Sequence, residues 1–153
     1  SGMLFREMAK EKGMTLEEFT LFAEKDHSVD RAIDSRAVAE AMRGCVVLDG
    51  HIAAWVAKDH AHLTIYLHAS EKVRAERIAQ RDGKSLNEAL NEVKLRDESE
   101  ARRYKEIYGI NVRDLHPIDL VLNTSKFDAD STYEICMEAV KQVLKGLTRL
   151  GKA

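Results

Sequence analysis

Apolar and polar positions alternate with helical spacing through most of the chain. Six stretches carry this pattern, and it predicts helices over residues 4–9, 15–22, about 30–43, 71–81, 85–108 and 130–147. Three short apolar runs break the periodicity, and each predicts a strand: Cys45 to Leu48, Leu63 to Leu67 and Leu120 to Leu122. The first is rich in valine and bounded by glycines, which is typical of a fully buried parallel strand.

Strands that alternate with helices indicate an α/β fold, with a parallel sheet covered by helices. No long linker rich in Gly, Ser or Pro divides the chain, so residues 1–153 are expected to form a single domain. Ligands of parallel sheets gather at the carboxyl ends of the strands. Polar pairs follow all three predicted strands: Asp49-Gly50, Ala69-Ser70 and Asn123-Thr124.

The long helix predicted over 85–108 carries the most informative motif, R-D-x-x-E-x-x-R. Its spacing places Arg96, Glu100 and Arg103 on one helical face, with Asp97 beside them. Two guanidiniums on one face can bind a phosphate through paired, charge-assisted hydrogen bonds, and a carboxylate between them can accept from a sugar hydroxyl. The combination suggests nucleotide binding, although solvated pairs along a surface helix have the same spacing and are more common, so the rest of the chain has to decide between the two.

A second motif resembles the end of a phosphate-binding loop but has a simpler explanation. Gly83-Lys84-Ser85 would need a glycine at position 78, which is Ile78, and a strand where a helix is predicted. Instead, Gly83 is expected to end one helix, and Ser85 with Glu88 to form a capping box for the next. No other part of the printed sequence matches G-x-x-x-x-G-K-[ST].

Composition narrows the classes of function. The formal net charge of -2 provides no basic field, so no nucleic-acid partner is expected. No apolar run is long enough to span a membrane, and no signal peptide is recognised. The two cysteines, Cys45 and Cys136, have no CxxC partner and are expected to be reduced core thiols of a cytoplasmic protein. The histidines form no metal-binding set.

Taken together, segments along nearly the whole chain resemble the archaeal-type cytidylate kinases, a family of P-loop nucleoside monophosphate kinases. The segments that carry the resemblance are Ser1–Arg6 (S-G-x-x-F-R), Val46–Gly50, Arg74–Arg81, Arg96–Ile110 and Asp119–Thr124. Two departures are clear. The family begins with a strand and a glycine-rich phosphate loop, whereas this chain starts roughly where the second strand would end. His51 stands where the family usually has an arginine after Asp/Glu-Gly.

The resemblance implies transfer of the terminal phosphoryl group of ATP, with Mg²⁺, to CMP or dCMP. It assigns the acceptor to Ser1, Arg6, Asp49, His51, Arg96, Glu100 and Arg103. It places Arg77 and Arg81, with Arg74 on the same face, in a lid around residues 77–95 that closes over the donor phosphates. Asp49 would act on Mg²⁺ as a catalytic carboxylate, and the donor base would lie near Asn123, Thr124 and Lys126.

Each of these assignments has a simpler alternative. Arg74, Arg77 and Arg81 alternate with acidic residues and could form surface pairs, and Asp49 could be a turn residue before Gly50. Without a phosphate loop, the chain as printed is expected to be poorly active. The alternative function is a non-catalytic nucleotide-binding module, or one that forms a homodimer through an exposed sheet edge.

Overall fold

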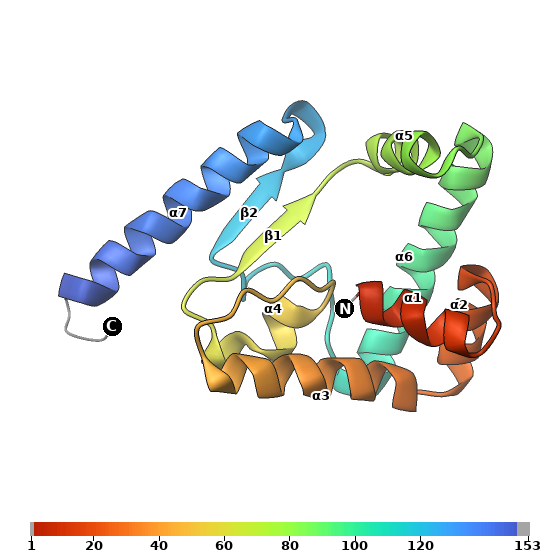
Figure 1. Ribbon diagram of the computed structural model, residues 1–153, viewed down its shortest axis with the longest axis horizontal. Coiled ribbons are helices and arrows are strands. Elements are labelled where there is room, and N and C mark those ends of the chain that lie inside the picture. Colours follow the sequence, from red (N-terminus) through yellow and green to blue (C-terminus); the bar gives the residue numbers. More distant parts are fainter. Residues whose placement is uncertain (1, 150–153) are drawn as a thin grey trace.

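The computed structural model describes residues 2–149 and shows a helix-rich α/β arrangement (Figure 1). In chain order the elements are α1 (Gly2–Glu11), α2 (Leu16–Lys25), α3 (Ser28–Arg43), α4 (Ala53–Val56), η1 (Lys58–His60), β1 (Ile65–His68), α5 (Glu71–Asp82), α6 (Leu86–Tyr108), β2 (Leu120–Asn123), η2 (Thr124–Lys126) and α7 (Ala129–Arg149). All six predicted helices are confirmed, with their ends shifted by a few residues. Two of the three predicted strands form.

Local capping determines where several helices begin and end. Thr15 and Glu18 form a capping box at the start of α2, with Thr15 N to Glu18 Oε2 at 2.8 Å. Ser85 and Glu88 form a second one at the start of α6, with Ser85 N to Glu88 Oε2 at 2.9 Å. Gly83 ends α5 in the left-handed conformation at φ 66°, which glycine adopts without steric cost. The capping interpretation of residues 83–88 is therefore confirmed.

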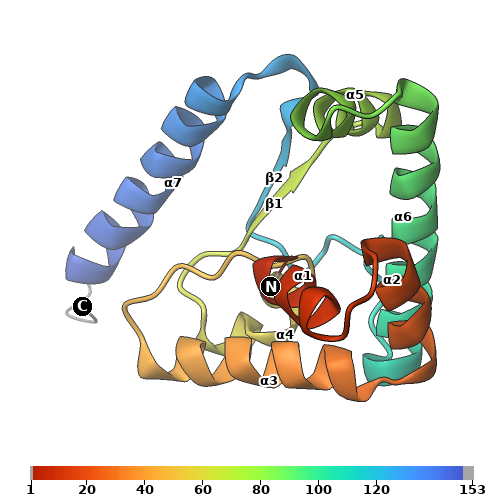
Figure 2. The ribbon, with the colours of Figure 1, turned by 45° about the vertical axis from the view of Figure 1, so that its right-hand side comes forward.

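The first three helices and the second half of α6 form what we call the helical lobe. Its apolar core contains Ala9, Phe19, Ala23, Val29 and Ile33, and Phe19 and Ala23 are fully buried. The ring of Phe5 packs against Phe19 with centroids 4.7 Å apart. In Figures 1 and 2, α6 runs from this lobe to α5 at the other end of the molecule.

Helices α5 and α6 form a helical hairpin joined by a short turn, and in Figures 1 and 2 α5 lies across the end of α6 rather than alongside it. Ala75 and Ala89 are fully buried between the two helices, next to Val93. The small alanine side chains allow the two backbones to approach closely, so that charged side chains on the flanks of the hairpin lie near one another.

The two strands form a parallel pair, as the alternation of strands and helices predicts. Ile65 lies opposite Leu120, and His68 lies opposite Asn123. Just before the strands, the carboxylate of Asp119 accepts hydrogen bonds from the backbone N–H and the hydroxyl of Thr64, both at 2.7 Å. This contact fixes the register at the point where the strands begin to pair.

The prediction of a buried strand over Cys45 to Leu48 is wrong. These residues lie outside the helices and strands, and Val47 is 95% exposed. The run pairs with neither strand of the two-stranded sheet, and the side chains of Val46 and Val47 remain exposed while Leu48 is partly buried. Cys45, at φ 51°, is also exposed, which corrects its assignment as a core thiol, whereas Cys136 is partly buried.

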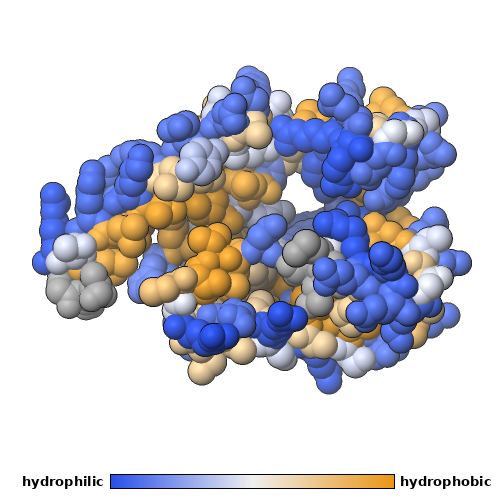
Figure 3. Space-filling view, in the orientation of Figure 1, coloured by the Kyte–Doolittle hydropathy of each residue, from blue (hydrophilic) through white to orange (hydrophobic). Residues whose placement is uncertain are grey.

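Helix α7 forms as predicted, but none of its described residues is buried. Tyr133 is 61% exposed and Leu144 is 56% exposed. Figure 3 shows apolar side chains along the inner side of α7 and over the strands.

We call β1, β2, residues 44–50 and α7 the sheet half. The expected covering of the sheet by helices is not seen among the described residues. None of the described helices has the length and apolar character needed to cross a membrane.

Candidate functional site

A pocket of about 280 Å³ lies along the α5–α6 hairpin. Ionisable side chains dominate its lining: His51, Arg74, Arg77, Arg96, Asp97 and Glu100, with Ile78 and Val93 providing the apolar part. Three guanidiniums in one pocket are suited to binding a multiply charged oxyanion, because guanidinium geometry matches phosphate oxygens in pairs.

Glu100 is the central acid of the pocket. One carboxylate oxygen forms an ion pair with Nδ1 of His51, and the other lies 3.5 Å from Nη2 of Arg96. Burial by itself raises the pKa of Glu100, but the hydrogen bond and charge of His51, together with Arg96 and Arg103, lower the pKa below its usual value. Glu100 is therefore ionised at neutral pH, and its carboxylate contacts both His51 and Arg96 in the lining of the pocket.

His51 responds to the same contact in the opposite direction. Burial alone lowers the pKa of its imidazole, but the hydrogen bond and negative charge of Glu100 outweigh that effect, and the net pKa is raised. The ring also lies edge-on to Tyr104, with centroids 6.0 Å apart. The contact with Glu100 therefore favours the imidazolium form.

Arg74 and Asp97 form a two-point ion pair across the hairpin. Nη1 of Arg74 donates to Asp97 Oδ1 at 2.8 Å, and Nη2 donates to the other oxygen. The hydrogen bond with Asp97 raises the pKa of Arg74 further. Nε of Arg74 is buried and has no hydrogen-bond partner among the described residues, which leaves one donor for water or a ligand.

Arg77 connects α5 to the end of β2. Its guanidinium donates to the hydroxyl of Thr124 at 3.0 Å, to the Thr124 carbonyl at 2.7 Å and to the Phe127 carbonyl at 3.3 Å. The hydroxyl of Thr124 in turn donates to the carbonyl of His68 at 3.2 Å. Arg77 thus binds neutral oxygens in the structure, and no described carboxylate forms an ion pair with it.

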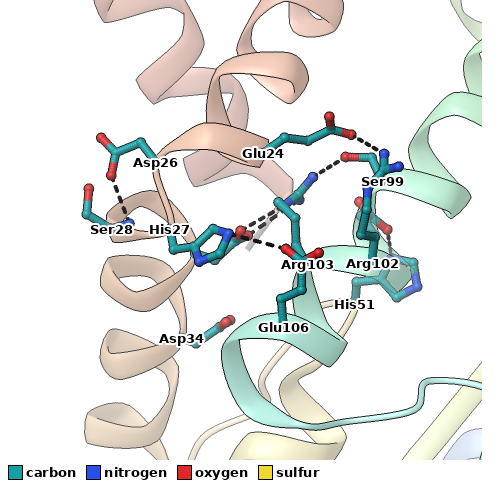
Figure 4. A network of polar contacts seen from close by, with 12 residues as sticks. Glu24, Asp26, His27, Ser28, Asp34, His51, Ser99, Arg102, Arg103 and Glu106 are labelled. Carbon is teal, nitrogen blue, oxygen red and sulfur yellow. Dashed lines mark hydrogen bonds and ion pairs between the residues drawn. The ribbon is translucent and has the colours of Figure 1, made fainter.

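Arg103 lies away from this pocket, in the interior of the helical lobe (Figure 4). Its side chain is 3% exposed, and Nε donates to Asp30 Oδ2 at 2.7 Å. A second nitrogen donates to the hydroxyl of the fully buried Ser99. Arg103 therefore pairs within the lobe and does not line the pocket with Arg96 and Glu100, which the motif groups with it, and its assignment to the acceptor stays a prediction.

The helical lobe contains a second polar contact between α3 and α6, formed by Asp34 and Tyr108. The hydroxyl of Tyr108 donates to Asp34 Oδ2 at 2.9 Å. Burial raises the pKa of Asp34 to about 6, although the Tyr108 hydrogen bond opposes this and the neighbouring Asp30 adds to it. The pKa of Tyr108 is raised for the complementary reasons, chiefly burial and its contact with Asp34.

The remaining predicted site residues lie around the pocket or farther from it. Arg81 is exposed and donates to Asp82 at 2.6 Å. Arg6 is exposed on α1, and its positive charge adds to the dominant effect of Arg81 in lowering the pKa of Asp82. Asp49 is exposed, two residues before His51. Ser1 lies outside the described residues.

The donor-base residues follow β2. The side chain of Asn123 accepts from Ser125 N at 3.0 Å, Thr124 is buried and Lys126 is exposed in η2. Within residues 2–149, no three His, Cys, Asp or Glu side chains lie close enough together to hold a metal ion. These assignments also stay predictions.

Two partners in the site were not assigned from the sequence. Asp97 pairs with Arg74 in the pocket, and Asp30 pairs with Arg103 in the lobe. Asp97 stands next to Arg96 in the motif, which is a usable signal. Asp30 lies 73 positions from Arg103, and no local pattern connects them.

Residues 1–126 match the model of the cytidylate kinase-like family. The chain belongs to this family. Among curated cytidylate kinases, that of Staphylothermus marinus is 42% identical over 145 residues, covering 95% of this chain and 82% of the relative. That of Pyrobaculum aerophilum is 47% identical over 138 residues, covering 90% of this chain and 75% of the relative.

The cytidylate kinase of Pyrococcus horikoshii is 43% identical over 140 residues, covering 92% of this chain and 72% of the relative. No solved structure gave a significant match. The family resemblance inferred from the ordered motifs is confirmed, and the chain is a nucleoside monophosphate kinase by membership of the cytidylate kinase-like family.

Proposed function

We propose that the pocket along the α5–α6 hairpin binds the acceptor of an ATP-dependent phosphoryl transfer to CMP or dCMP. The observation that carries this proposal is the gathering of three arginines, one histidine and Glu100 in one pocket of a cytidylate kinase-like chain. Phosphoryl transfer depends on positioning and on cationic stabilisation of spread negative charge, and these side chains supply both.

Within the pocket, Arg96 would bind the phosphate of the acceptor, and Glu100 would orient Arg96 or accept from the pentose. Nη2 of Arg96 already lies 3.5 Å from Oε1 of Glu100, so the two side chains can act together without a rearrangement. Arg74 and Arg77 come from α5, on the side from which the proposed lid would close. Arg81, Arg6 and Arg103 would complete the set of cations from outside the pocket.

Mg²⁺ in such enzymes is held through one or two carboxylates, with substrate phosphates and water completing its shell. Asp49 fits that role in chemical type: it is an exposed carboxylate two residues before the pocket residue His51. The bound ion would neutralise phosphate charge. Asn123, Thr124 and Lys126 would lie near the donor base.

The printed chain contains no glycine-rich phosphate loop, whose backbone N–H groups and lysine bind the donor phosphates in P-loop kinases. We therefore expect this chain to bind CMP but to transfer phosphate at trace rates. A coupled assay that showed an ordinary enzymatic rate would contradict this part of the proposal.

The direct test is calorimetric titration with CMP, with UMP, AMP and ATP as controls. Arg96→Ala should weaken CMP binding about tenfold or more, because it removes a charged hydrogen bond. Arg102→Ala is the matched control: Arg102 lies on the same helix but binds Glu24 at 2.7 Å, outside the pocket. No CMP binding by the natural sequence, or equal binding by Arg96→Ala, would overturn the proposal.

Self-association is the second candidate function, favoured by the exposed apolar side chains of the sheet half. Val47 is 95% exposed, Leu67 is 50% exposed and Val121 is 39% exposed, and each lies on or near the two-stranded sheet. A second copy could pair with a strand edge and cover these side chains. Light scattering across concentrations tests this, and a monomer at all concentrations would exclude it.

A further inference from the structure

The ion pair of Arg74 and Asp97 joins the two helices that line the pocket. Arg74 comes from α5 and Asp97 from α6, and both terminal nitrogens of the guanidinium donate to the two carboxylate oxygens. The two side chains are 34% and 36% exposed, so a pair of this kind contributes little to stability. A carboxylate in a pocket for anions also repels the ligand. Neither stability nor charge therefore explains why Asp97 lies there.

The pair leaves one edge of the guanidinium free. A guanidinium carries five N–H groups in a fixed plane, and two of its edges can each bind two oxygens of an anion. Asp97 takes the edge formed by Nη1 and Nη2, which leaves the edge formed by Nε and the second N–H of Nη2. Nε is the only buried side-chain nitrogen or oxygen of the described residues that has no hydrogen-bond partner. A buried donor without a partner costs free energy, which a ligand oxygen would restore.

Two other arginines of the chain show what this edge binds. In Arg81, Nε donates to Asp82 at 2.6 Å and Nη2 donates to its other oxygen at 2.8 Å. In Arg103, Nε donates to Asp30 at 2.7 Å and Nη2 donates to its other oxygen at 3.4 Å. The Nε–Nη2 edge of each thus binds both oxygens of one anion. The same edge of Arg74 is open and belongs to a pocket residue, so a ligand is the anion that fits it.

We propose that Asp97 is a positioning residue of the acceptor site, which holds one edge of Arg74 so that the Nε–Nη2 edge binds two oxygens of the acceptor phosphate. Asp97 acts through Arg74 and does not touch the acceptor. Without Asp97, the long side chain of Arg74 would have to be ordered by the ligand itself, and the entropy lost in that ordering would weaken binding. The inference rests on the proposed function, because it takes this pocket as the acceptor site.

The sign of the effect separates positioning from charge. If Asp97 acted only by Coulomb repulsion, its removal would strengthen the binding of an anion. If it positions Arg74, its removal weakens that binding. Asp97→Ala should therefore weaken CMP binding about fivefold, although the variant makes the pocket more positive, and should leave the binding of cytidine, which has no phosphate, unchanged. Calorimetric titration with CMP and with cytidine at neutral pH measures both.

Conservative variants and a matched control sharpen this test. Asp97→Glu keeps a carboxylate with two oxygens and should regain part of the lost affinity, whereas Asp97→Asn offers one oxygen in nearly the same shape and should resemble Asp97→Ala. Glu98→Ala removes the same charge from the next position of α6. Because Glu98 is exposed and does not line the pocket, its removal should change CMP affinity by less than about twofold.

A double-mutant cycle identifies the side chain through which Asp97 acts. In an Arg74→Ala background, Asp97→Ala should cause no further loss of CMP affinity, because the side chain that it positions is already gone. A loss of the same size in that background would assign the effect to another residue and overturn the proposal.

A spectroscopic readout needs no variant at position 97. The Nε–H resonance of Arg74 should shift downfield when CMP is added and should not move with cytidine, because only the phosphate brings an acceptor to this donor. An Nε–H resonance that saturating CMP leaves unmoved would overturn the proposal.

The outcomes separate the two proposals. Equal or tighter CMP binding by Asp97→Ala would overturn the role of Asp97 and leave the acceptor site standing. A parallel loss of CMP and cytidine binding, with a lowered melting temperature, would identify a purely structural pair and overturn that role too. Absence of CMP binding by the natural sequence would overturn the acceptor site itself, and the role of Asp97 with it.

Discussion

The helical lobe and the sheet half use the same local signals but differ in what they bury. In the lobe, Phe19, Ala23 and Ser99 are fully buried, and even Arg103 is 2% exposed. In the sheet half, α7 has no buried residue among those described, and Val47 is almost fully exposed. Apolar periodicity is enough to place a helix in both regions. Burial requires a partner surface, and only the lobe provides one within the described residues.

The largest expected effect tests this contrast directly. Phe19→Ala should destabilise the protein by about 3–5 kcal/mol, because it empties a filled core site. Leu144→Ala, a deletion of an exposed apolar side chain on α7, should cost less than about 0.5 kcal/mol. Urea denaturation measures both. Similar losses would show that α7 is covered in solution, and the contrast between the two regions would disappear.

The next prediction concerns the buried ion pair of the lobe. Arg103→Ala leaves Asp30, which is 4% exposed, charged and without its partner, and should cost about 3 kcal/mol. Arg102→Ala is the matched control, since the Arg102–Glu24 pair is 56% and 22% exposed and worth at most about 1 kcal/mol. If Arg103→Ala lost no more stability than Arg102→Ala, the lobe would have to relax around the space that the arginine leaves.

Asp34 makes the stability of the lobe depend on pH. Its folded-state pKa of about 6 lies above the ordinary value of 3.8, so the folded state favours the protonated carboxyl. The stabilisation is complete below pH 3.8 and is lost as pH rises through about 6. Asp34→Asn avoids this loss and keeps an acceptor for Tyr108. It should therefore be more stable than the natural sequence by about 2–3 kcal/mol at pH 7.5 and nearly equal to it at pH 4.

Denaturation curves at those two pH values measure the difference. Asp59→Asn, at an exposed position of η1, should change stability little at either pH. The explanation through Asp34 would be refuted by a stability gain that is the same at pH 4 as at pH 7.5.

The smallest effect belongs to the sheet half. Asp119→Ala removes the acceptor for both groups of Thr64 and should cost about 1 kcal/mol, since the carboxylate is largely solvated. The Thr64 bonds lower the pKa of Asp119, so this contribution is present above its ordinary pKa and is lost as pH falls. Amide hydrogen exchange at Thr64 reports it. Unchanged protection in Asp119→Ala would show that the strands hold their register without this contact.

Helices and their ends could be predicted from the sequence because their causes are local. The capping boxes at Thr15 and Ser85 and the left-handed Gly83 each involve residues at most five positions apart. The structure of residues 45–48 could not be predicted in this way. An apolar run forms a strand only beside another strand, and no local pattern tells whether such a partner is present. The same limit explains why apolar periodicity correctly predicts a helix over 130–147, whereas Leu144 within that helix is exposed.

The candidate site follows the same division. The spacing of Arg96 and Glu100 correctly placed them in contact, since four positions make one turn of helix. Spacing also grouped Arg103 with them, but tertiary packing turned its side chain toward Asp30, 73 positions away. The contact between His51 and Glu100 joins a loop to a helix, and no periodic pattern relates them. Side chains on one helix are predictable as neighbours, and their partners on other elements are not.

The α5–α6 hairpin has a consequence for how the chain folds. Its apolar seam joins Ala75 to Ala89 and Val93, all close in sequence, across a turn that Gly83 and the Ser85 cap define. Closing such a short loop costs little chain entropy, so this unit should form early and guide later steps. Ala89→Gly should then slow refolding nearly in proportion to the stability it removes, whereas Phe19→Leu should mainly accelerate unfolding. The arginines of the pocket would thus be brought together before the lobe that supports them has closed.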